Sequence, residues 1–145
     1  MILRPATAQD AAAIAVVHRT AMRVSLAFLP ELHTAQADLA YFSERFLPAN
    51  TVWVAEREGQ VVGYIGYDPD WINHLFVHPD AQGQGIGPGL LAKALEDGRR
   101  RRLWTFQQNT RARRFYEARG FVAVEFTDGE GNEEKTPDVR YAWTP

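Results

Sequence analysis

A glycine-rich loop near the middle of the chain has the composition of a phosphate-binding turn. It runs Gln82-Gly83-Gln84-Gly85-Ile86-Gly87, and the sequence predicts a strand before it and a helix after it. Glycines let the backbone curl so that successive N–H groups point inward, and the start of a helix adds partial positive charge. The loop therefore predicts a cradle for a phosphate or pyrophosphate, with a plain tight turn as the alternative.

Neither of two common phosphate-binding motifs fits this loop. A P-loop needs Gly-Lys-Ser/Thr after its spacer, and the chain has no such triplet. A dinucleotide-binding fingerprint could be placed on Gly87, Gly89 and Ala92, but these residues fall inside the predicted helix. Gln107 and Gln108 stand where that fingerprint has an acidic residue. The sequence therefore excludes both motifs.

A tyrosine in a later predicted helix has the chemistry of a proton donor. Asn109 is the predicted N-cap of a helix over 110–119, and Tyr116 shares a helical face with Ala112. A phenol with a pKa of about 10 holds its proton at neutral pH and can act as an acid. The alternative is that Tyr116 is simply a core aromatic beside Phe115.

Two segments of the chain resemble the signature motifs of the GNAT superfamily of N-acetyltransferases. Residues 75–87, Leu-Phe-Val-His-Pro-Asp-Ala-Gln-Gly-Gln-Gly-Ile-Gly, resemble its acyl-CoA motif, a strand followed by Gln or Arg, two residues, Gly, one residue, and Gly or Ala. Residues 109–121 resemble its second motif, in which Asn opens a helix carrying Phe-Tyr, and Gly-Phe begins the next strand. The motifs carry the resemblance over 71–126, and the order of predicted elements extends it to nearly the whole chain.

The resemblance implies a role for each matching residue. The backbones of Leu75, Phe76 and Val77 would pair with the pantetheine arm of acetyl-CoA as if it were another strand. N–H groups would bind the pyrophosphate from Gln82, Gly83, Gln84, Gly85, Ile86 and Gly87. In the second motif, Asn109 would hydrogen-bond the pantetheine, Phe115 would pack beside the cofactor, and Tyr116 would protonate the departing thiolate. Among the basic residues of this helix, Arg119 is the predicted phosphate contact.

The chain departs from the family pattern at Pro88, where members usually place a residue with a backbone N–H. One phosphate donor is therefore lost, which predicts a lower CoA affinity. Proline is well tolerated in the first turn of a helix, so we expect the site itself to be retained.

The reaction implied by the resemblance is direct attack by an amine on the thioester carbonyl, with both substrates bound. A backbone amide near Phe76 or Val77 would stabilise the oxyanion. An alkyl amine with a pKa of about 10 is mostly protonated at pH 7, so freeing its lone pair costs about 4 kcal/mol and calls for a base. The candidates for that base, direct or through water, are Asp70, His74, Glu56 and, as a water holder only, Asn73. The sequence does not identify the acceptor amine, which is left open among polyamines, amino acids, antibiotics and protein amines.

Charge is distributed unevenly along the chain. The formal net charge of −2 is composed of −4 over residues 1–92, +6 over 93–119 and −4 over 120–145. The run Arg99 to Arg102 is interpreted as a solvated helix end, with the CoA 3′-phosphate or a nucleic acid as alternative contacts. The acid-rich segment 128–138 is interpreted as a solvated turn, with attraction of a cationic amine as the alternative.

The elements that must position these residues alternate between helices and strands. Strands are predicted at 2–4, 51–56, 61–67, 71–77, 103–106, 121–126 and 139–143, and helices at 8–23, after Thr34, at 88–97 and at 110–119. Thr7 and Asp10 have the spacing of a capping box. Leu39, Phe42 and Phe46 mark the buried face of the second helix, and Pro48 is expected to end it. The prediction is a mixed α/β fold of the GNAT acyltransferase type, with one twisted, mostly antiparallel sheet flanked by helices and opened near its middle for the cofactor.

Length and composition restrict the class of protein. With 145 residues, 46% of them hydrophobic, we expect a single domain over 1–145 with its own core. The absence of cysteine excludes a disulfide scaffold and a cysteine nucleophile, and the four histidines show no metal-ligand spacing, so no metal is expected. No apolar run approaches the ~20 residues of a membrane span, and no signal peptide is visible, which predicts a cytoplasmic protein.

The function predicted from these observations is an acetyl-CoA-dependent N-acetyltransferase acting on a small-molecule or protein amine. A non-catalytic acyl-CoA sensor on the same fold is the first rival. A nucleic-acid-binding module using the arginine run is the second, and the two acidic segments argue against it. Neither nucleic acid nor membrane is an expected partner, and the oligomeric state is left open, with a homodimer as one option.

Overall fold

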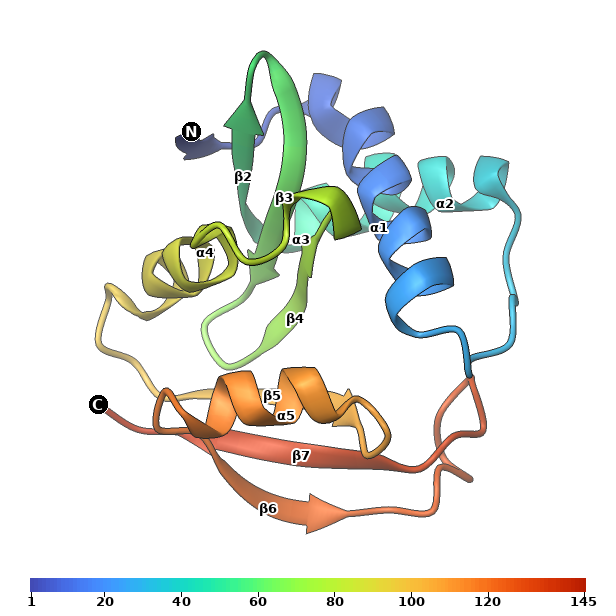
Figure 1. Cartoon of the computed structure of the whole chain (residues 1–145), viewed down its shortest axis with the longest axis vertical. Helices are drawn as coiled ribbons and strands as arrows, with labels where there is room; N and C mark the ends of the chain where they lie inside the picture. The colour runs from blue at the N-terminus through green and yellow to red at the C-terminus, as the bar shows by residue number, and fades with distance from the viewer. The chain divides into compact units, whose positions relative to one another are not determined.

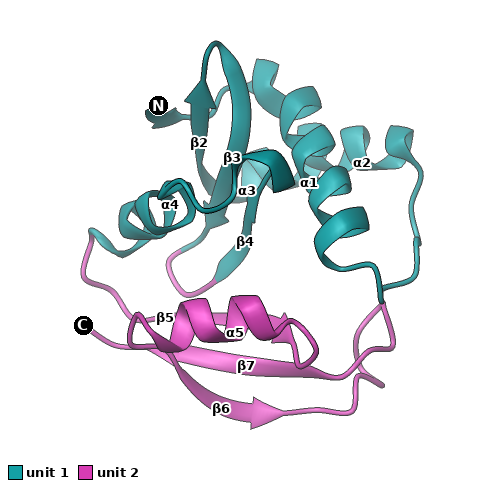
Figure 2. Ribbon diagram, in the orientation of Figure 1, with its two compact units in different colours: residues 1–68, 72–96 teal, residues 69–71, 97–145 magenta.

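The computed structural model describes all 145 residues, Met1–Pro145, and divides them into two compact units (Figure 2). The first unit consists of residues 1–68 and 72–96, and the second of residues 69–71 and 97–145. The expectation of one domain over 1–145 stays a prediction.

The first unit contains a four-stranded antiparallel sheet in the order β1-β2-β3-β4 (Figure 1). Its strands are β1 (Ile2–Pro5), β2 (Thr51–Arg57), β3 (Gln60–Tyr67) and β4 (Ile72–Val77). Its helices are α1 (Ala11–Ser25), α2 (Ala35–Tyr41), the short α3 (Leu47–Ala49) and α4 (Ile86–Leu95). A π-helical turn over Phe42–Phe46 joins α2 to α3, and single 3-10 turns cover Ala8–Asp10 and Pro79–Ala81.

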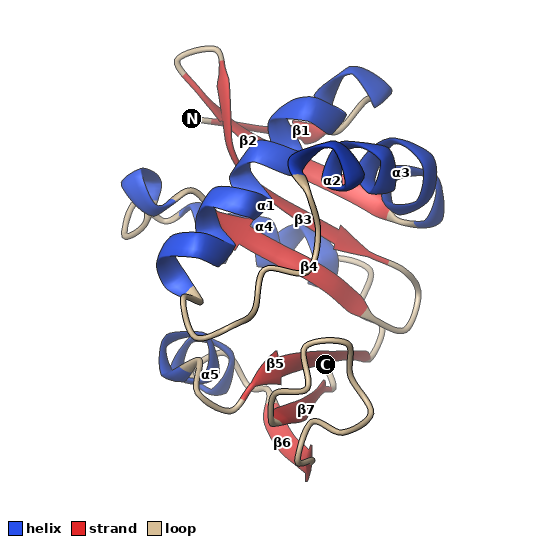
Figure 3. Ribbon diagram, turned by 90° about the vertical axis from the view of Figure 1, so that its right-hand side faces the viewer, coloured by secondary structure: helices blue, strands red, loops and turns tan.

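Helices cover both faces of this sheet, with α1 and α2 on one face and α4 on the other (Figure 3). Neighbouring residues of β3 show the alternation: Tyr64 packs against Phe42 and Phe46, whereas Gly63 faces Ile86 and Leu90 of α4. Phe42, Phe46 and Tyr64 are at most 1% exposed and form much of the core on the α1 side.

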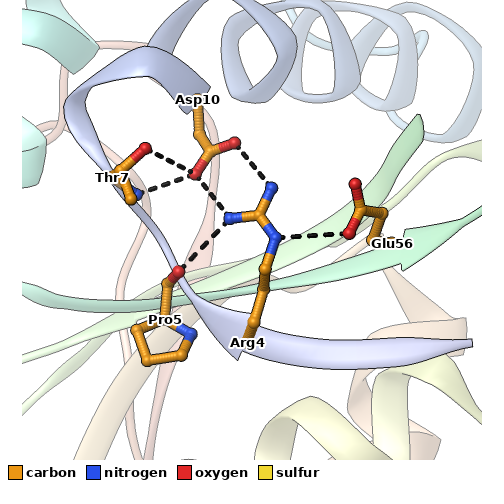
Figure 4. Close-up of polar contacts among 5 residues, drawn as sticks. All are labelled: Arg4, Pro5, Thr7, Asp10 and Glu56. Carbon is orange, nitrogen blue, oxygen red and sulfur yellow. Dashed lines mark hydrogen bonds and ion pairs between the residues drawn. The ribbon is translucent and has the colours of Figure 1, made fainter. Parts of the chain in front are cut away.

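The start of the first helical segment confirms the predicted capping pair (Figure 4). The Asp10 carboxylate accepts a hydrogen bond from the Thr7 backbone N–H at 2.7 Å. It also accepts two bonds from the guanidinium of Arg4 on β1, both of 2.9 Å. The cap of the helix is therefore tied to the first strand of the sheet.

One expectation about the second helix is wrong. Leu39 is 41% exposed, so only Phe42 and Phe46 of the predicted stripe are buried. The π-helical turn is the reason, because it changes the helical period between Leu39 and Phe46. The helical segment ends at Ala49, one residue after Pro48, as expected for a proline stop.

The second unit contains a three-stranded antiparallel sheet and one helix. Its elements are β5 (Arg101–Phe106), α5 (Thr110–Glu117), β6 (Val122–Phe126) and β7 (Asp138–Trp143), and the strand order is β5-β7-β6. Residues 69–71 belong to this unit because the N–H of Arg102 donates to the carbonyl of Asp70 at 2.9 Å, and Trp71 forms a parallel bridge with Arg102.

The mixed α/β class and the antiparallel strands flanked by helices are confirmed. The expectation of a single sheet, opened near its middle, is corrected in one respect, because the strands form two separately hydrogen-bonded sheets. β4 forms a ladder with β3 only, and the isolated bridge at Trp71 does not extend into a second ladder. The alternation of apolar residues indicated seven strands but contained no signal for which edges pair.

Candidate active site

β4 is the terminal strand of its sheet and carries the first three predicted cofactor contacts. Leu75, Phe76 and Val77 are paired with Ile65, Tyr64 and Gly63 of β3. A terminal strand has a partner on one side only, so the backbone groups along its other side are not used by its own sheet. β4 therefore has the geometry needed to accept an extended ligand as an additional strand.

The glycine-rich loop after β4 has a backbone that only glycine adopts easily. Gly83 and Gly85 both have φ of +80°, in the left-handed region, and a Cβ at either position would meet no atom within 4 Å. Space is therefore available above these residues, and the requirement for glycine comes from the backbone conformation. Gly85 is the N-cap of α4, so the loop leads directly into the positive end of the helix dipole.

The amides in the middle of this loop have no partner in the chain, whereas the N–H of Gln82, also a predicted pyrophosphate donor, is directed to the Pro79 carbonyl at 3.5 Å. None of the N–H groups of Gly83, Gln84 and Gly85 donates to another backbone or side-chain group. Ile86 and Gly87 follow in the first turn of α4, where N–H groups lack an intrahelical acceptor. Successive unpaired donors at a helix start form an anion-binding concavity, and Pro88 in the same turn removes one donor without interrupting the helix.

Three contacts hold the loop in place. Gly63 lets α4 approach β3 closely, because a Cβ there would lie 3.1 Å from Ile86 Cγ2 and 3.2 Å from the Phe76 carbonyl oxygen. The Gln82 side chain donates to the Val77 carbonyl at 3.3 Å, which links the loop to the end of β4. His78 stabilises the turn, since its Nδ1 accepts the N–H of Asp80 at 3.1 Å.

Arg57 at the end of β2 is a residue that sequence reasoning missed. Its guanidinium donates a hydrogen bond to the side-chain oxygen of Gln84 in the glycine-rich loop. This contact places a permanent positive charge beside the unpaired amides. The residues lie 27 positions apart, and their contact depends on the pairing of β2 with β3, so no local sequence signal could have found it.

The second unit holds the other predicted site residues, on or beside α5. Asn109 caps this helix as predicted: its Oδ1 accepts the N–H of Ala112 at 3.1 Å. Tyr116 is 8% exposed and packs against Phe115, Phe121 and Tyr141. Burial raises the pKa of the Tyr116 phenol well above its usual range, so the phenol keeps its proton at neutral pH.

Arg119 folds back onto its own helix. It donates to the Phe115 carbonyl at 3.0 Å, and its guanidinium lies 4.0 Å from the centre of the Phe115 ring. The two groups of predicted residues thus fall in different units: Leu75 to Gly87 in the first, and Asn109 to Arg119 in the second.

The candidate bases differ in their hydrogen bonds and in their burial. Glu56 accepts a hydrogen bond from Arg4 at 3.3 Å, in the same network as Asp10 (Figure 4). His74 is half-buried, and desolvation by the groups packed around it lowers the pKa of its imidazole to about 3, which makes it a poor acceptor of a proton at pH 7. Asn73 donates to Asn50 at 2.8 Å and to Asp68 at 3.2 Å.

A cluster of aromatic and histidine rings surrounds His74, and no sequence signal indicated it. The Tyr64 hydroxyl and His74 Nδ1 form a hydrogen bond of 2.9 Å. The His18 ring from α1 stacks on the His74 ring with centroids 5.2 Å apart, and it meets the Phe76 ring edge-on at 5.0 Å. His18 Nδ1 is buried without a hydrogen-bond partner, and burial lowers the pKa of His18. Only the fold could bring α1, β3 and β4 together here.

The arginine run follows the end of α4, and its interpretation as solvated holds for the exposed Arg99, Arg100 and Arg102 but is wrong for Arg101. Arg101 opens β5 and is 1% exposed, and it forms a two-bond ion pair with Asp97 at 2.7 and 2.9 Å. The guanidinium of Arg102 lies 4.4 Å from the centre of the Trp71 ring. Arg99 donates to the Pro69 carbonyl at 3.3 Å. These contacts hold residues 69–71 within the second unit.

The acid-rich segment is an ordered loop between β6 and β7. Asn132 donates to the Thr136 carbonyl at 2.8 Å and to Asp138 at 3.1 Å, and it accepts the Thr136 N–H at 3.2 Å. Lys135 donates to the Glu130 carbonyl at 2.7 Å. The segment is therefore a turn, as predicted, with internal hydrogen bonds that fix its path.

Comparison with known families identifies the family to which the chain belongs. Residues 48–123 match the family model described as an acetyltransferase (GNAT) domain, which is more than half of the chain. The chain is a member of the GNAT family. The matched range contains β4, the glycine-rich loop and α5, so this GNAT domain includes all of the predicted site residues.

Curated relatives agree with this assignment. The GNAT chain is 38% identical over 98 residues to an uncharacterized N-acetyltransferase of Archaeoglobus fulgidus, covering 57% of this chain and 66% of that protein. It is 34% identical over 111 residues to the L-amino acid N-acyltransferase MnaT of Escherichia coli, covering 68% of this chain and 63% of that protein. The matches thus span about two thirds of each of these relatives.

Solved structures show the same fold. The apo form of YjaB from Escherichia coli superposes with a TM-score of 0.80 at 23% identity, covering 99% of this chain and 98% of that one. The structure of yncA from Salmonella typhimurium with its cofactor acetyl-CoA superposes with a TM-score of 0.75 at 23% identity, covering 98% and 91%. None of the helices of this GNAT protein has the length and apolar character needed to cross a membrane.

Proposed function

We propose that this protein is an acetyl-CoA-dependent N-acetyltransferase that transfers the acetyl group to a primary amine in a ternary complex. The observation that carries the proposal is the run of unpaired amides from Gly83 into the first turn of α4, directly after the terminal strand β4. Family membership supports the same activity.

The residues present fit the charged and extended parts of acetyl-CoA. The backbone of Leu75 to Val77 would hold the pantetheine arm along the free edge of β4. The amides of Gly83 to Gly87 would bind the pyrophosphate, and each charge-assisted hydrogen bond is worth roughly 1.5–3 kcal/mol. Arg57 adds a positive charge at the same loop, and we assign it a supporting role in phosphate binding. Asn109, Phe115 and Arg119 keep their predicted roles along the arm and at a phosphate.

The chemical step needs stabilisation of negative charge and a proton donor. Acetyl-CoA supplies an acetyl group activated as a thioester. A backbone N–H near Phe76 or Val77 would stabilise the oxyanion that forms when the amine attacks. Tyr116 would hold a proton at its hydroxyl and donate it to the departing sulfur. The raised pKa of Tyr116 keeps this proton in place until the sulfur becomes negatively charged.

The acceptor amine must lose a proton before it attacks. His74 is disfavoured as the base by its low pKa, and Glu56 by its bond to Arg4. Asp70 and a water held by Asn73 remain from the initial candidates. The relative MnaT is named for L-amino acids, which supports an amino acid as the first acceptor class to examine.

The proposal is tested by mixing the protein with acetyl-CoA and a panel of amines and measuring free thiol. The chain contains no cysteine, so the thiol signal has no contribution from the protein. We expect turnover with at least one amine, and a loss of roughly 10²-fold or more in kcat for Tyr116→Phe, with acetyl-CoA binding by calorimetry unchanged. Binding without turnover would favour the acyl-CoA sensor. Absence of both would reject the proposal.

A further inference from the structure

Four partly exposed rings lie next to one another on the face of the first sheet that α1 and α2 cover (Figure 3). His18 comes from α1, Tyr41 from α2, and His74 and Phe76 from β4. Tyr41 is 42% exposed, and the other three are half-buried. Between ring centres, His18 lies 5.2 Å from His74 and 5.0 Å from Phe76, and Tyr41 stacks on His74 at 6.3 Å. We call these four side chains the ring surface.

A second layer of rings supports the ring surface from below. Phe42 and Phe46 are each 1% exposed, and Tyr64 is fully buried. The Phe46 ring lies 4.4 Å from the His74 ring between centres, and the Tyr64 hydroxyl forms its hydrogen bond with His74 Nδ1 at 2.9 Å. The ring surface is therefore fixed in position by a packed core, and its outer side is exposed. Contiguous apolar surface of this kind is typical of a binding site.

The two histidines of the ring surface are neutral at pH 7. Desolvation lowers the pKa of both, that of His74 to about 3. The geometry at His18 favours the same state, because its Nδ1 is buried and has no hydrogen-bond partner. A protonated imidazole would carry an N–H at this atom, and an N–H that is buried without an acceptor is costly. The ring surface thus presents uncharged rings to a ligand.

No unpaired carboxylate faces the ring surface. Among the charged groups whose fields act on His18, the only carboxylate is Asp38, which accepts a hydrogen bond from Arg19 at 3.0 Å. The charge that acts on Tyr41 is cationic and belongs to Arg45. A ligand with a second ammonium group would therefore meet cations here, and no free anion would compensate it.

We propose that the ring surface binds an aromatic or apolar group of the acceptor, so that the acceptor is a primary amine attached to such a group rather than a polyamine. This inference rests on the proposed function, and Phe76 connects the two. The backbone of Phe76 lies where the thioester would be held, and its side chain belongs to the ring surface. An acceptor whose apolar group packs on His18, Tyr41 and Phe76 would thus lie next to the acetyl group.

Two matched pairs of acceptors test this inference by the release of free thiol from acetyl-CoA. Phenethylamine and 1,4-diaminobutane carry a ring or a second ammonium group, and L-phenylalanine and L-arginine repeat the comparison among amino acids. In whichever pair is turned over, we expect kcat/KM to be roughly 10- to 100-fold higher for the aromatic member, because only that member gains from burial of its ring. The pair that is used shows whether the apolar group belongs to a simple amine or to an amino acid.

Variants of α2 test the contribution of the most exposed ring. Tyr41→Ala should raise KM for the aromatic acceptor by roughly 10-fold with little change in kcat, since it removes binding surface and no reacting group. Tyr41→Phe keeps the ring and should keep the KM of the wild type. The matched control is Leu39→Ala, at a 41% exposed position on the same helix, and it should leave KM unchanged. Circular dichroism establishes that each variant is folded.

A binding measurement tests the ring surface without turnover. Phenethylamine is titrated into the protein with and without CoA, and the imidazole C–H signals are followed by nuclear magnetic resonance. The signals of His18 and His74 should shift, because a bound aromatic ring would lie against them. The signal of His78, in the turn after β4, should stay in place.

The results that would overturn the inference differ from those that would reject the proposed function. Turnover of 1,4-diaminobutane and L-arginine at or above the rate of their aromatic partners would overturn the inference and leave the acetyltransferase intact. Equal effects of Tyr41→Ala and Leu39→Ala on KM would also contradict it. Absence of thiol release with every amine would reject the proposed function, and unshifted His18 and His74 signals would then remove the ring surface as a binding site as well.

Discussion

The half-buried pair His74 and His18 predicts a loss of stability in mild acid. Burial lowers the pKa of folded His74 to about 3, whereas the unfolded chain has the ordinary value of 6.5. Below pH 6.5 the unfolded state therefore binds a proton that the folded state does not. The stability contributed by neutral His74 is complete above pH 6.5 and is lost as the pH falls from 6.5 towards 3.

The size of the effect follows from these two pKa values. Between pH 7.5 and pH 5.0 the free energy of unfolding should fall by about 2 kcal/mol from His74 alone. The lowered pKa of His18 acts in the same direction. The assay is urea denaturation at several pH values between 5.0 and 7.5, followed by tryptophan fluorescence.

Two variants test whether His74 causes the loss of stability in acid. His74→Phe keeps a ring in the core and leaves the Tyr64 hydroxyl without its partner, which costs ~1 kcal/mol at every pH and so cancels in the comparison. The acid-dependent loss should shrink by about 2 kcal/mol in this variant. Tyr64→Phe should keep the full loss, because burial rather than the hydrogen bond lowers the pKa. A His74→Phe protein with the pH dependence of the wild type would refute the reasoning.

Three further predictions concern the loop, the helix behind it and the second unit. Gly85→Ala should lower the affinity for acetyl-CoA, measured by calorimetry, by one to two orders of magnitude, because it displaces a phosphate-binding amide. The control is Gly98→Ala, at a residue with a similar positive φ of +70° and equally open surroundings, and this variant should lose only stability. Gly63→Ala should cost ~1–3 kcal/mol in urea denaturation because its new methyl group crowds α4, and an unchanged midpoint would contradict the close packing. Asp97→Ala should cost roughly 1.5–3 kcal/mol by leaving the buried Arg101 without its carboxylate, while Glu96→Ala, next to it but exposed, should cost under about 0.5 kcal/mol.

Local signals predicted most of the elements correctly. Asn109 as a cap, Gly120 with φ of +89° after α5, and the Thr7–Asp10 pair each depend on contacts within a few residues. Such contacts are encoded in short stretches of sequence, so they could be predicted without knowledge of the fold. The motif around the glycine-rich loop belongs to the same class.

The incorrect or missing predictions concern residues whose contact partners lie far apart in the sequence. The solvated interpretation of Arg101 failed because its burial depends on where β5 enters the second sheet. Arg57 was missed because it meets Gln84 only through strand pairing. The division into two sheets could not be predicted for a similar reason, since apolar alternation identifies a strand and leaves its neighbours undetermined.

The terminal position of β4 has a consequence for how this protein can change over evolutionary time. Under the proposed function, β4 would recognise its donor through main-chain atoms, so it would present the same hydrogen-bonding groups whichever side chains it carries. Substitutions that leave this six-residue strand folded would therefore leave its contacts with the donor in place.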